Sequence, residues 1–175
     1  ILDNENSNKK VYEWLRDYTS EGNLDAITGY FTIGALGYLS QKTNEKINKY
    51  RFILGDIVNT EQQKNYTINL LNEDISIEAS LKLKSLAREV VSFLKQNKVE
   101  VKTLEPNFCH AKAYIYNDKK DERLKYFISG SSNLTEAGIG LKQTNNVELN
   151  IAKTGDSNQF RALVKWFDEL WNKPQ

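Results

Sequence analysis

The chain has 175 residues, a formal net charge of +1, a single histidine, a single cysteine and no methionine. This length suits one domain with a sizeable core, and the near-neutral charge excludes a global basic field, so any nucleic-acid contact needs a local basic patch. The lone Cys109 excludes an intrachain disulfide and a cysteine cluster for zinc, and the lack of a long apolar run or leader segment predicts a cytoplasmic protein without membrane association.

The first half of the sequence predicts helices that alternate with strands. Apolar residues at helical spacing follow a polar start, and two later apolar runs are typical of strands. The predicted elements are a helix at 11–18, a strand at 24–31, a short helix at 33–39, a strand at 50–54 and a polar, partly helical segment at 59–80.

The second half continues the same rhythm. The predicted elements are an amphipathic helix at 83–94, strands at 99–104, 109–116, 124–129 and 147–152, a charged connection at 117–123 and a closing amphipathic helix at 160–171. No internal repeat interrupts this order. The alternation predicts an α/β fold with a mixed sheet, and we expect residues 1–175 to form one domain.

The strand predicted at 109–116 carries the only histidine. Its period-two alternation predicts His110, Lys112, Tyr114 and Tyr116 on one face, with Cys109, Ala111, Ala113 and Ile115 on the other. A lone histidine is more often structural than catalytic. Burying Lys112 without a partner would be costly, however, so the shared face should meet solvent, an acid or a ligand. A phosphate would satisfy both side chains with charge-assisted hydrogen bonds.

A turn at Gly130-Ser131-Ser132-Asn133 follows the next predicted strand. Such a turn needs no function. Its backbone N–H groups, hydroxyl and amide could equally bind an anion. Glu148, at the start of the following strand, either faces solvent, balances a lysine or orients an imidazole by accepting a ring N–H.

Aromatic residues flank these segments. Tyr30, Phe31, Tyr114 and Tyr116 are interpreted as core or sheet-face residues in preference to base-stacking platforms.

Taken together, these motifs resemble one half-site of the phospholipase D superfamily. The order is His110-x-Lys112, then Gly130-Ser131-x-Asn133, then Asn146-x-Glu148, each at a predicted strand end, and the resemblance covers residues 104–152. It implies a sandwich whose mixed sheet is flanked by helices on both faces. The family's aspartate would stand at Asn117, and Asp118 follows it.

The resemblance also implies a mechanism without a metal or other cofactor. A histidine attacks a phosphodiester to form a phosphohistidine, which water then hydrolyses. The catalytic residues would be His110, Lys112 and Glu148, and Lys112, Gly130, Ser131 and Asn133 would bind phosphate. A second histidine protonates the leaving oxygen, so a chain with one histidine implies a homodimer that shares its active site.

Shorter strings refine the resemblance. Ile1-Leu2-Asp3-Asn4, Thr28-Gly29-Tyr30-Phe31 and Ile53-Leu54-Gly55 look like nuclease domains at the start of bacterial helicases. We therefore expect a DNA endonuclease domain, and the missing methionine favours a fragment of a longer, helicase-fused protein. Two alternatives stay open: a catalytically weak nucleic-acid-binding and dimerisation module of a helicase, and a lipid phosphodiesterase, which lacks support from an interfacial amphipathic segment.

Overall fold

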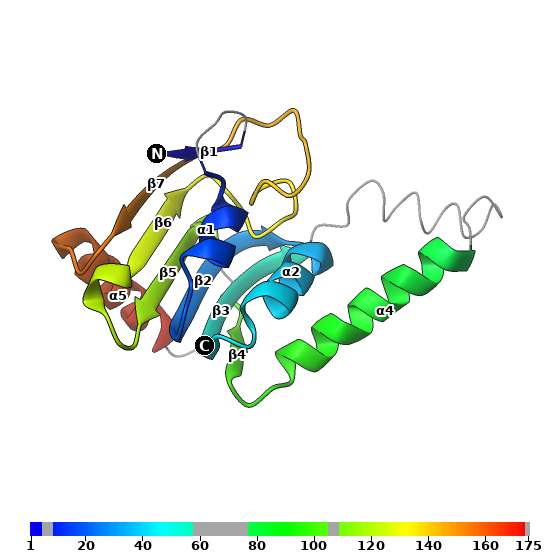
Figure 1. The fold of residues 1–175 in the computed structure, drawn as a ribbon, viewed down its shortest axis with the longest axis horizontal. Helices are drawn as coiled ribbons and strands as arrows, with labels where there is room; N and C mark the ends of the chain where they lie inside the picture. Colours follow the sequence, from blue (N-terminus) through cyan, green and yellow to red (C-terminus); the bar gives the residue numbers. More distant parts are fainter. Residues whose placement is uncertain (5–8, 58–76, 105–108, 174–175) are drawn as a thin grey trace.

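The computed structural model describes residues 1–4, 9–57, 77–104 and 109–173, without the side chains of 57, 77–81 and 83. In order, the helices and strands are β1 Leu2–Asp3, α1 Val11–Asp17, β2 Gly22–Phe31, α2 Ile33–Thr43, β3 Ile47–Ile57, α4 Ile77–Leu94, β4 Val99–Lys102, β5 Ala113–Asp118, the 3-10 helix η1 Glu122–Leu124, β6 Tyr126–Gly130, β7 Leu149–Thr154 and α5 Asn158–Trp171. Helices and strands alternate from β1 to β4, and strands predominate from β4 to β7 before the closing helix, as predicted (Figure 1).

The described strands form one mixed sheet of seven, in the order β1-β7-β6-β5-β2-β3-β4. The pairs β2–β3 and β3–β4 are parallel, whereas β2–β5, β5–β6, β6–β7 and β1–β7 are antiparallel. The predicted α/β class with a mixed sheet is therefore confirmed.

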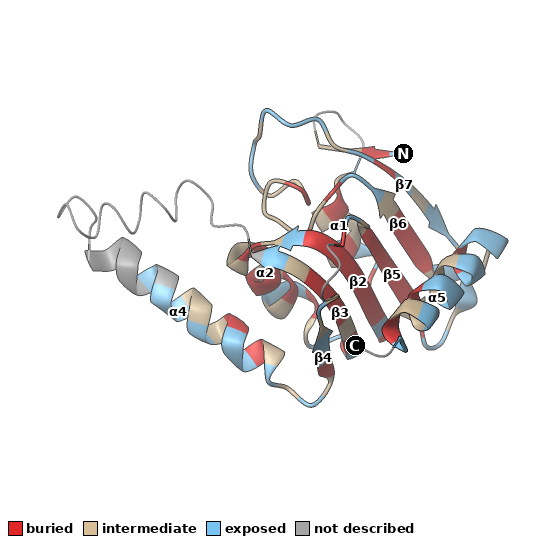
Figure 2. Ribbon diagram, turned by 180° about the vertical axis from the view of Figure 1, so that it is seen from behind, coloured by how far each residue is buried: buried red, intermediate tan, exposed pale blue. Residues whose placement is uncertain are grey.

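Helices cover both faces of this sheet, as predicted. One core joins strand residues to α1, α2 and α4, and the second joins the opposite strand faces to α5 (Figures 1 and 2). Strand β5 contributes to both: Tyr114 and Tyr116 are buried in the first core, and Ala113 and Ile115 in the second. The predicted alternation is thus correct for β5, and its two tyrosines are core residues.

An arginine fixes α5 to the sheet. Arg51 on β3 donates two hydrogen bonds to the Asp25 carboxylate on β2, at 2.8 and 2.6 Å, and pairs with Asp168 of α5 at 2.8 Å. Its guanidinium also lies 5.0 Å from the ring centre of Phe167. A planar fork suits this combination of a bidentate carboxylate and a stacked ring, which a lysine would not reproduce.

Several predicted boundaries are wrong in instructive ways. The strand predicted at 109–116 begins only at Ala113, and Leu124 lies in η1 instead of a strand. Asn117 and Asp118 belong to β5, not to the connection, because they pair with β2. Of the segment predicted at 59–80, residues 77–80 begin α4 and the rest lies outside the described residues. Within the described part of the chain, no helix is both long and apolar enough to cross a bilayer.

Candidate functional site

The predicted site residues meet at one edge of the sheet. Antiparallel pairing places the start of β5, the end of β6 and the start of β7 side by side, with Ala113 opposite Ser129 and Gly130 opposite Asn150. The end of β2 lies at the same edge, because β2 is antiparallel to β5. This arrangement gathers the segments that carry His110, Lys112, Gly130, Ser131, Asn133 and Glu148.

His110 and Lys112 contact each other just before β5. The Lys112 ammonium lies 3.5 Å from Nδ1 of His110 and donates to the His110 carbonyl at 2.7 Å. An ammonium can donate only to an unprotonated Nδ1, which leaves the proton of a neutral ring on Nε2. When Lys112 turns to another acceptor, such as a phosphate oxygen, Nδ1 is released from this contact and can carry the ring proton, which leaves Nε2 as the nucleophile.

Gly130 joins this pair to β7. Its amide donates to the Lys112 carbonyl at 3.3 Å, so the backbone hydrogen bonding between β5 and β6 extends to Lys112. A Cβ on Gly130 would stand 2.3 Å from the carbonyl oxygen of Leu149 and 2.7 Å from Cα of Asn150. Because backbone atoms cannot yield that much space, this close approach of β6 to β7 requires glycine.

Ser131 and Glu148 are hydrogen-bonded across the β6–β7 pair. The Ser131 hydroxyl donates to the Glu148 carboxylate, and its oxygen accepts from the Leu149 amide at 3.0 Å. The Glu148 amide donates to the Asn4 side chain at 2.9 Å. Burial first, and the Glu148 charge second, raise the pKa of Tyr114 above its usual value. Glu148 is thus fixed at the site rather than extended into solvent.

Asn133 connects the turn to β2. Its side-chain oxygen accepts hydrogen bonds from the Thr28 hydroxyl and the Tyr30 amide, both at 3.1 Å. Because these bonds orient the carboxamide, its nitrogen is the atom that can donate to a ligand. A Cβ on Gly29 would lie 2.4 Å from the Cys109 carbonyl oxygen, so β2 packs directly against the segment before β5. Sequence reasoning missed this contribution of β2.

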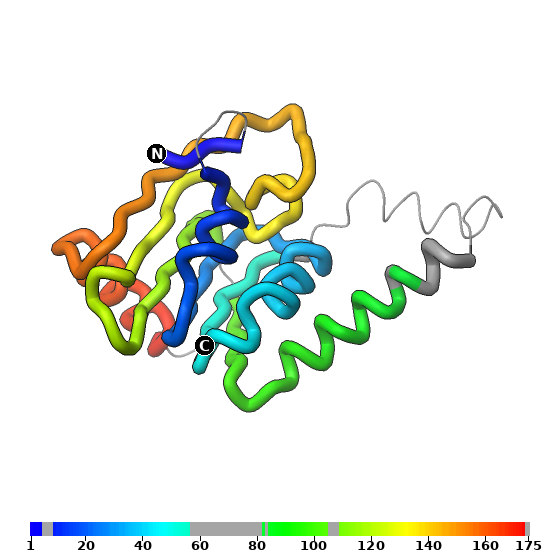
Figure 3. Tube along the Cα trace, viewed as in Figure 1, coloured from blue at the N-terminus to red at the C-terminus, as the bar shows by residue number. Residues whose placement is uncertain are grey.

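The rest of the 131–148 connection is anchored away from the sheet edge. It passes the end of β2, where Leu134 bridges Phe31, and then α1, where the Tyr12 amide donates to the Ile139 carbonyl at 3.0 Å (Figure 3). After Asn133 the chain forms hydrogen-bonded turns but no helix; in the first of them the Ile139 amide donates to the Thr135 carbonyl at 3.0 Å.

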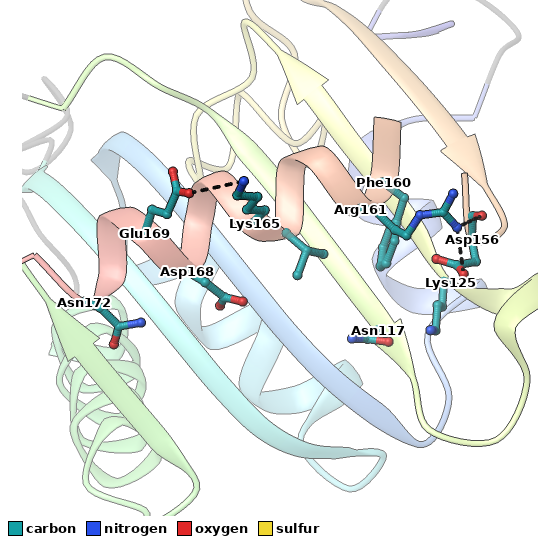
Figure 4. A pocket seen from close by; sticks show the side chains of 10 residues that line it. Asn117, Lys125, Asp156, Phe160, Arg161, Lys165, Asp168, Glu169 and Asn172 are labelled. Atoms are coloured by element: carbon teal, nitrogen blue, oxygen red, sulfur yellow. Dashed lines mark hydrogen bonds and ion pairs between the residues drawn. The ribbon is translucent and has the colours of Figure 1, made fainter. Parts of the chain in front are cut away.

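Asn117 does not join the site. It lies at the far end of β5, about 17 Å from Lys112 at the rise of an extended strand. Its side chain lines a cleft of about 670 Å³ beneath α5, together with Lys125 and Asp168 (Figure 4). The residue at this position of the motif therefore lies outside the reacting end.

Asp118 caps the turn that follows β5. Its carboxylate accepts hydrogen bonds from the Tyr116 hydroxyl at 2.6 Å and from the amides of Lys120 and Asp121 at 2.9 and 2.7 Å. Burial acts to raise the pKa of Asp118, but these three donors outweigh it and hold the pKa below its ordinary value.

The sheet edge is suited to an anion. It offers the Lys112 ammonium and the Asn133 amide next to an imidazole, and the Ser131 hydroxyl can donate there once it turns from Glu148. Within the described ranges, no three His, Cys, Asp or Glu side chains lie together as metal ligands. The chemistry that this set supports is nucleophilic attack by the imidazole on a phosphorus atom whose oxygens are held by cationic and neutral donors.

Comparison with known proteins agrees with this geometry. A family model described as "Cardiolipin synthase, PLD-like domain" matches residues 37–171, a range that contains every site residue predicted from the sequence. A solved structure of Nuc, a phospholipase D family member from Salmonella typhimurium, has a similar fold, with a TM-score of 0.53 and 12% sequence identity. The match covers 94% of this chain and 86% of that chain. No curated protein sequence matches the chain significantly.

Proposed function

The chain belongs to the phospholipase D superfamily, and on that premise we propose that it is a metal-independent phosphodiesterase that cleaves DNA through a phosphohistidine on His110. The observation that carries this proposal is the grouping of the His110–Lys112 contact, the Gly130–Asn133 turn and Glu148 at one edge of the sheet.

The reaction has two displacements at phosphorus. A ring nitrogen of His110 forms a P–N bond while the bond to the leaving oxygen breaks, and that oxygen takes a proton from a second imidazole. Water then gives its proton to that second imidazole and attacks phosphorus, which breaks the P–N bond and releases the phosphate. Such general acid–base help contributes about 10²–10⁴-fold to the rate.

The surrounding side chains have separate roles in this scheme. Lys112 and Asn133 hold the phosphoryl oxygens where negative charge develops, together with the backbone of Gly130, and the Ser131 hydroxyl joins them when its one proton turns from Glu148 to the phosphate. Glu148 accepts a ring N–H from an imidazole of the site and stabilises its charged form. Its position, held by Ser131, supports this role.

The second imidazole comes from a second copy of the chain, because His110 is the only histidine in the sequence. The working unit is then a homodimer with a two-fold axis near the two imidazoles. Because the reaction needs one neutral and one protonated imidazole, we expect a bell-shaped dependence of rate on pH.

The choice of DNA as substrate, and a link to a helicase motor, rest on the resemblance of residues 1–4, 28–31 and 53–55 to helicase-associated nuclease domains. A lipid phosphodiester is the second candidate, favoured by the description of the matching family model. A third is a module that binds DNA without cleaving it, in the service of an attached motor. Walker-type motifs in a longer form of the protein would support the helicase link.

One experiment separates these candidates. Wild type and His110→Ala are incubated in EDTA with plasmid DNA and, separately, with phosphatidylcholine vesicles. We expect plasmid cleavage by wild type only, together with an acid-labile phosphohistidine in the wild-type protein. Lipid cleavage alone would establish the second candidate. Equal DNA binding by both proteins without any cleavage would establish the binding module.

A further inference from the structure

Ser132 lies between the two residues of the turn whose side chains are proposed to bind phosphate, Ser131 and Asn133. It is 1% exposed, so its own side chain does not reach a substrate. Its amide donates to Oδ1 of Asn150 at 3.2 Å, its hydroxyl oxygen accepts from Nδ2 of Asn150 at 2.8 Å, and its carbonyl accepts from the Tyr114 hydroxyl at 3.0 Å. The middle of the turn is therefore fixed from inside the protein.

Asn150 is an unexpected residue for its position in β7. Asparagine is depleted in strands, and burying a carboxamide is unfavourable unless it is hydrogen-bonded. Asn150 is 2% exposed, and Ala152, the next residue on the same face of the strand, packs against the first core. An apolar side chain would suit this face by packing alone. The two hydrogen bonds to Ser132 account for the carboxamide.

Gly130 makes room for this carboxamide. Gly130 pairs directly with Asn150, so side chains at these two positions would project from the same face of the sheet. A Cβ on Gly130 would stand 2.7 Å from Oδ1 of Asn150. The glycine at the start of the turn therefore leaves the space through which the Asn150 side chain reaches Ser132.

Tyr114 holds the turn from the other side. It is buried in the first core and belongs to β5, whereas Asn150 belongs to β7. These are the two strands that flank β6, which the turn follows directly. Ser132 is thus bonded to the strands on both sides of the strand that leads into it.

These contacts fix both peptide planes of Ser132. Its amide belongs to the peptide that joins it to Ser131, and its carbonyl belongs to the peptide that joins it to Asn133. Because each peptide is planar and only φ and ψ rotate, an anchored amide and an anchored carbonyl leave residue 132 little freedom. The directions in which the chain runs to Ser131 and to Asn133 are then set together.

Other contacts orient the two flanking side chains one at a time. Glu148 bonds the Ser131 hydroxyl, and Thr28 bonds the Asn133 side chain. Neither contact sets the distance between the two side chains. That distance depends on the backbone of Ser132, which links them.

We propose that Asn150 and Tyr114 are positioning residues of the active site, which hold Ser132 so that the Ser131 and Asn133 side chains reach the same phosphate. The inference rests on the proposed function and deepens it, since both residues are buried and act through the turn. Donors to a developing charge must be held in place before the reaction, and a displacement of about 1 Å can lower a rate about 10²-fold.

The first test removes one hydroxyl group and leaves the packing intact. Tyr114→Phe loses the hydrogen bond to Ser132, and its matched control is Tyr50→Phe. Tyr50 is also a buried tyrosine of the first core, and its hydroxyl is hydrogen-bonded to Thr43 at 2.7 Å. It belongs to β3, two strands away from β5 in the sheet. Both variants lose one buried hydrogen bond, but only Tyr114→Phe releases the turn.

The second test removes two hydrogen bonds. Asn150→Ala deletes the carboxamide that bonds Ser132 twice, and Thr43→Ala is its control. The buried Thr43 hydroxyl also takes part in two hydrogen bonds, to the Leu39 carbonyl and with the Tyr50 hydroxyl, both at 2.7 Å. Urea titrations measure the stability of each variant, and cleavage rates and the binding of inorganic phosphate are measured on the same samples.

We expect Tyr114→Phe to raise the KM of the cleaved substrate and the dissociation constant of inorganic phosphate about 10-fold, the scale of one ordinary hydrogen bond. Asn150→Ala should raise both about 100-fold, because two bonds are lost. The controls should keep both constants within about twofold. Unfolding lowers the number of working molecules and leaves KM unchanged, so a raised KM distinguishes positioning from a loss of stability.

If Asn150→Ala does not fold, the pair Tyr114→Phe and Tyr50→Phe decides the question. Variants of Tyr114 and Asn150 that bind phosphate and cleave like their controls overturn the inference and leave the phosphodiesterase standing. A wild type that binds phosphate without cleaving DNA or lipid, and binds it more weakly in these variants, contradicts the phosphodiesterase and leaves the positioning role standing. A wild type that neither binds phosphate nor cleaves overturns both.

Discussion

Glu148 accepts a hydrogen bond from the hydroxyl of Ser131, seventeen residues earlier in the chain. A carboxylate has about four acceptor positions, so this bond leaves room for a ring N–H from an imidazole. The same contact ties the start of β7 to the end of β6, and therefore places the only acid of the proposed site next to its phosphate-binding turn.

Replacing Glu148 by glutamine should separate these two roles. Glutamine keeps an oxygen that accepts from Ser131 but removes the charge that stabilises an imidazolium. We expect Glu148→Gln to lower the cleavage rate by about 10–100-fold, the usual effect of losing a residue that orients a reacting group, with little change in stability. Initial rates over a range of pH measure the loss of activity, and a urea titration measures the stability. Glu100→Gln on β4 is the control, and equal rates for the two variants would contradict the role of Glu148.

Mixing intact and inactive chains tests the shared active site. When wild type and His110→Ala exchange subunits at equal amounts, only about one quarter of the dimers keep two imidazoles. We therefore expect the activity per wild-type chain to fall to about half after subunit exchange. A chain that carries a complete site of its own would keep its full activity in the mixture, and that result would exclude sharing.

Lys112 should matter for the chemical step more than for stability. In the free protein its ammonium bonds the His110 carbonyl, and on binding it turns to a phosphoryl oxygen. We expect Lys112→Met to lower kcat by about 10²–10³-fold, as loss of one donor to a developing charge does elsewhere. Lys119→Met, at the opposite end of β5, is the control for net charge. If both variants cleave equally, Lys112 acts only through general electrostatics.

Asn117 is expected to be neutral for catalysis. The motif of the superfamily has aspartate here, but the side chain lines the cleft beneath α5, far from His110. Asn117→Asp should therefore leave the cleavage rate within about twofold, as substitutions away from a site usually do. A rise of tenfold or more would show that this end of β5 communicates with the reacting end.

Asp118 should make stability depend on pH. Its pKa in the folded state lies below the value of about 3.9 in the unfolded chain. The stabilisation is therefore complete above about pH 4 and is lost as pH falls through the folded-state pKa. We expect Asp118→Asn to lower the free energy of unfolding by about 1–3 kcal/mol at pH 7, with a smaller difference near pH 3.

Urea titrations at several pH values measure this difference. The exposed Glu122→Gln, in the same turn, is the matched control and should change the free energy of unfolding by less than about 0.5 kcal/mol. A difference between wild type and Asp118→Asn that is the same at pH 3 and pH 7 would show that the carboxylate charge contributes nothing.

The fold followed from local patterns, because helical spacing and period-two alternation report burial on one or two faces. That is why the two faces of β5 were predicted correctly. The boundaries depended on pairing partners that no local pattern contains: Asn117 lies in a strand because Asn23 lies opposite it, and the two-residue β1 exists because β7 is there to pair with it.

In the candidate site, too, the local pattern was predictable and the contacts between distant segments were not. His110, Lys112, Ser131 and Glu148 were recognisable because their order along the chain is characteristic. The hydrogen bonds that Thr28 and Tyr30 donate to the Asn133 side chain could not be recognised in the sequence, because they join residues more than a hundred positions apart.

The site is carried by three strands that follow one another along the chain, and β2 is the main element from the first half of the sequence that reaches it. Substitutions in α1, α2 and α4 therefore need only preserve packing against the sheet. Outside Asn4 and the end of β2, a change in the described part of the first hundred residues that keeps this packing displaces no reacting atom. A common architecture at 12% identity is the outcome expected of such a design. Relatives of this chain should accordingly be sought by the short segment from His110 to Glu148 rather than by its helices.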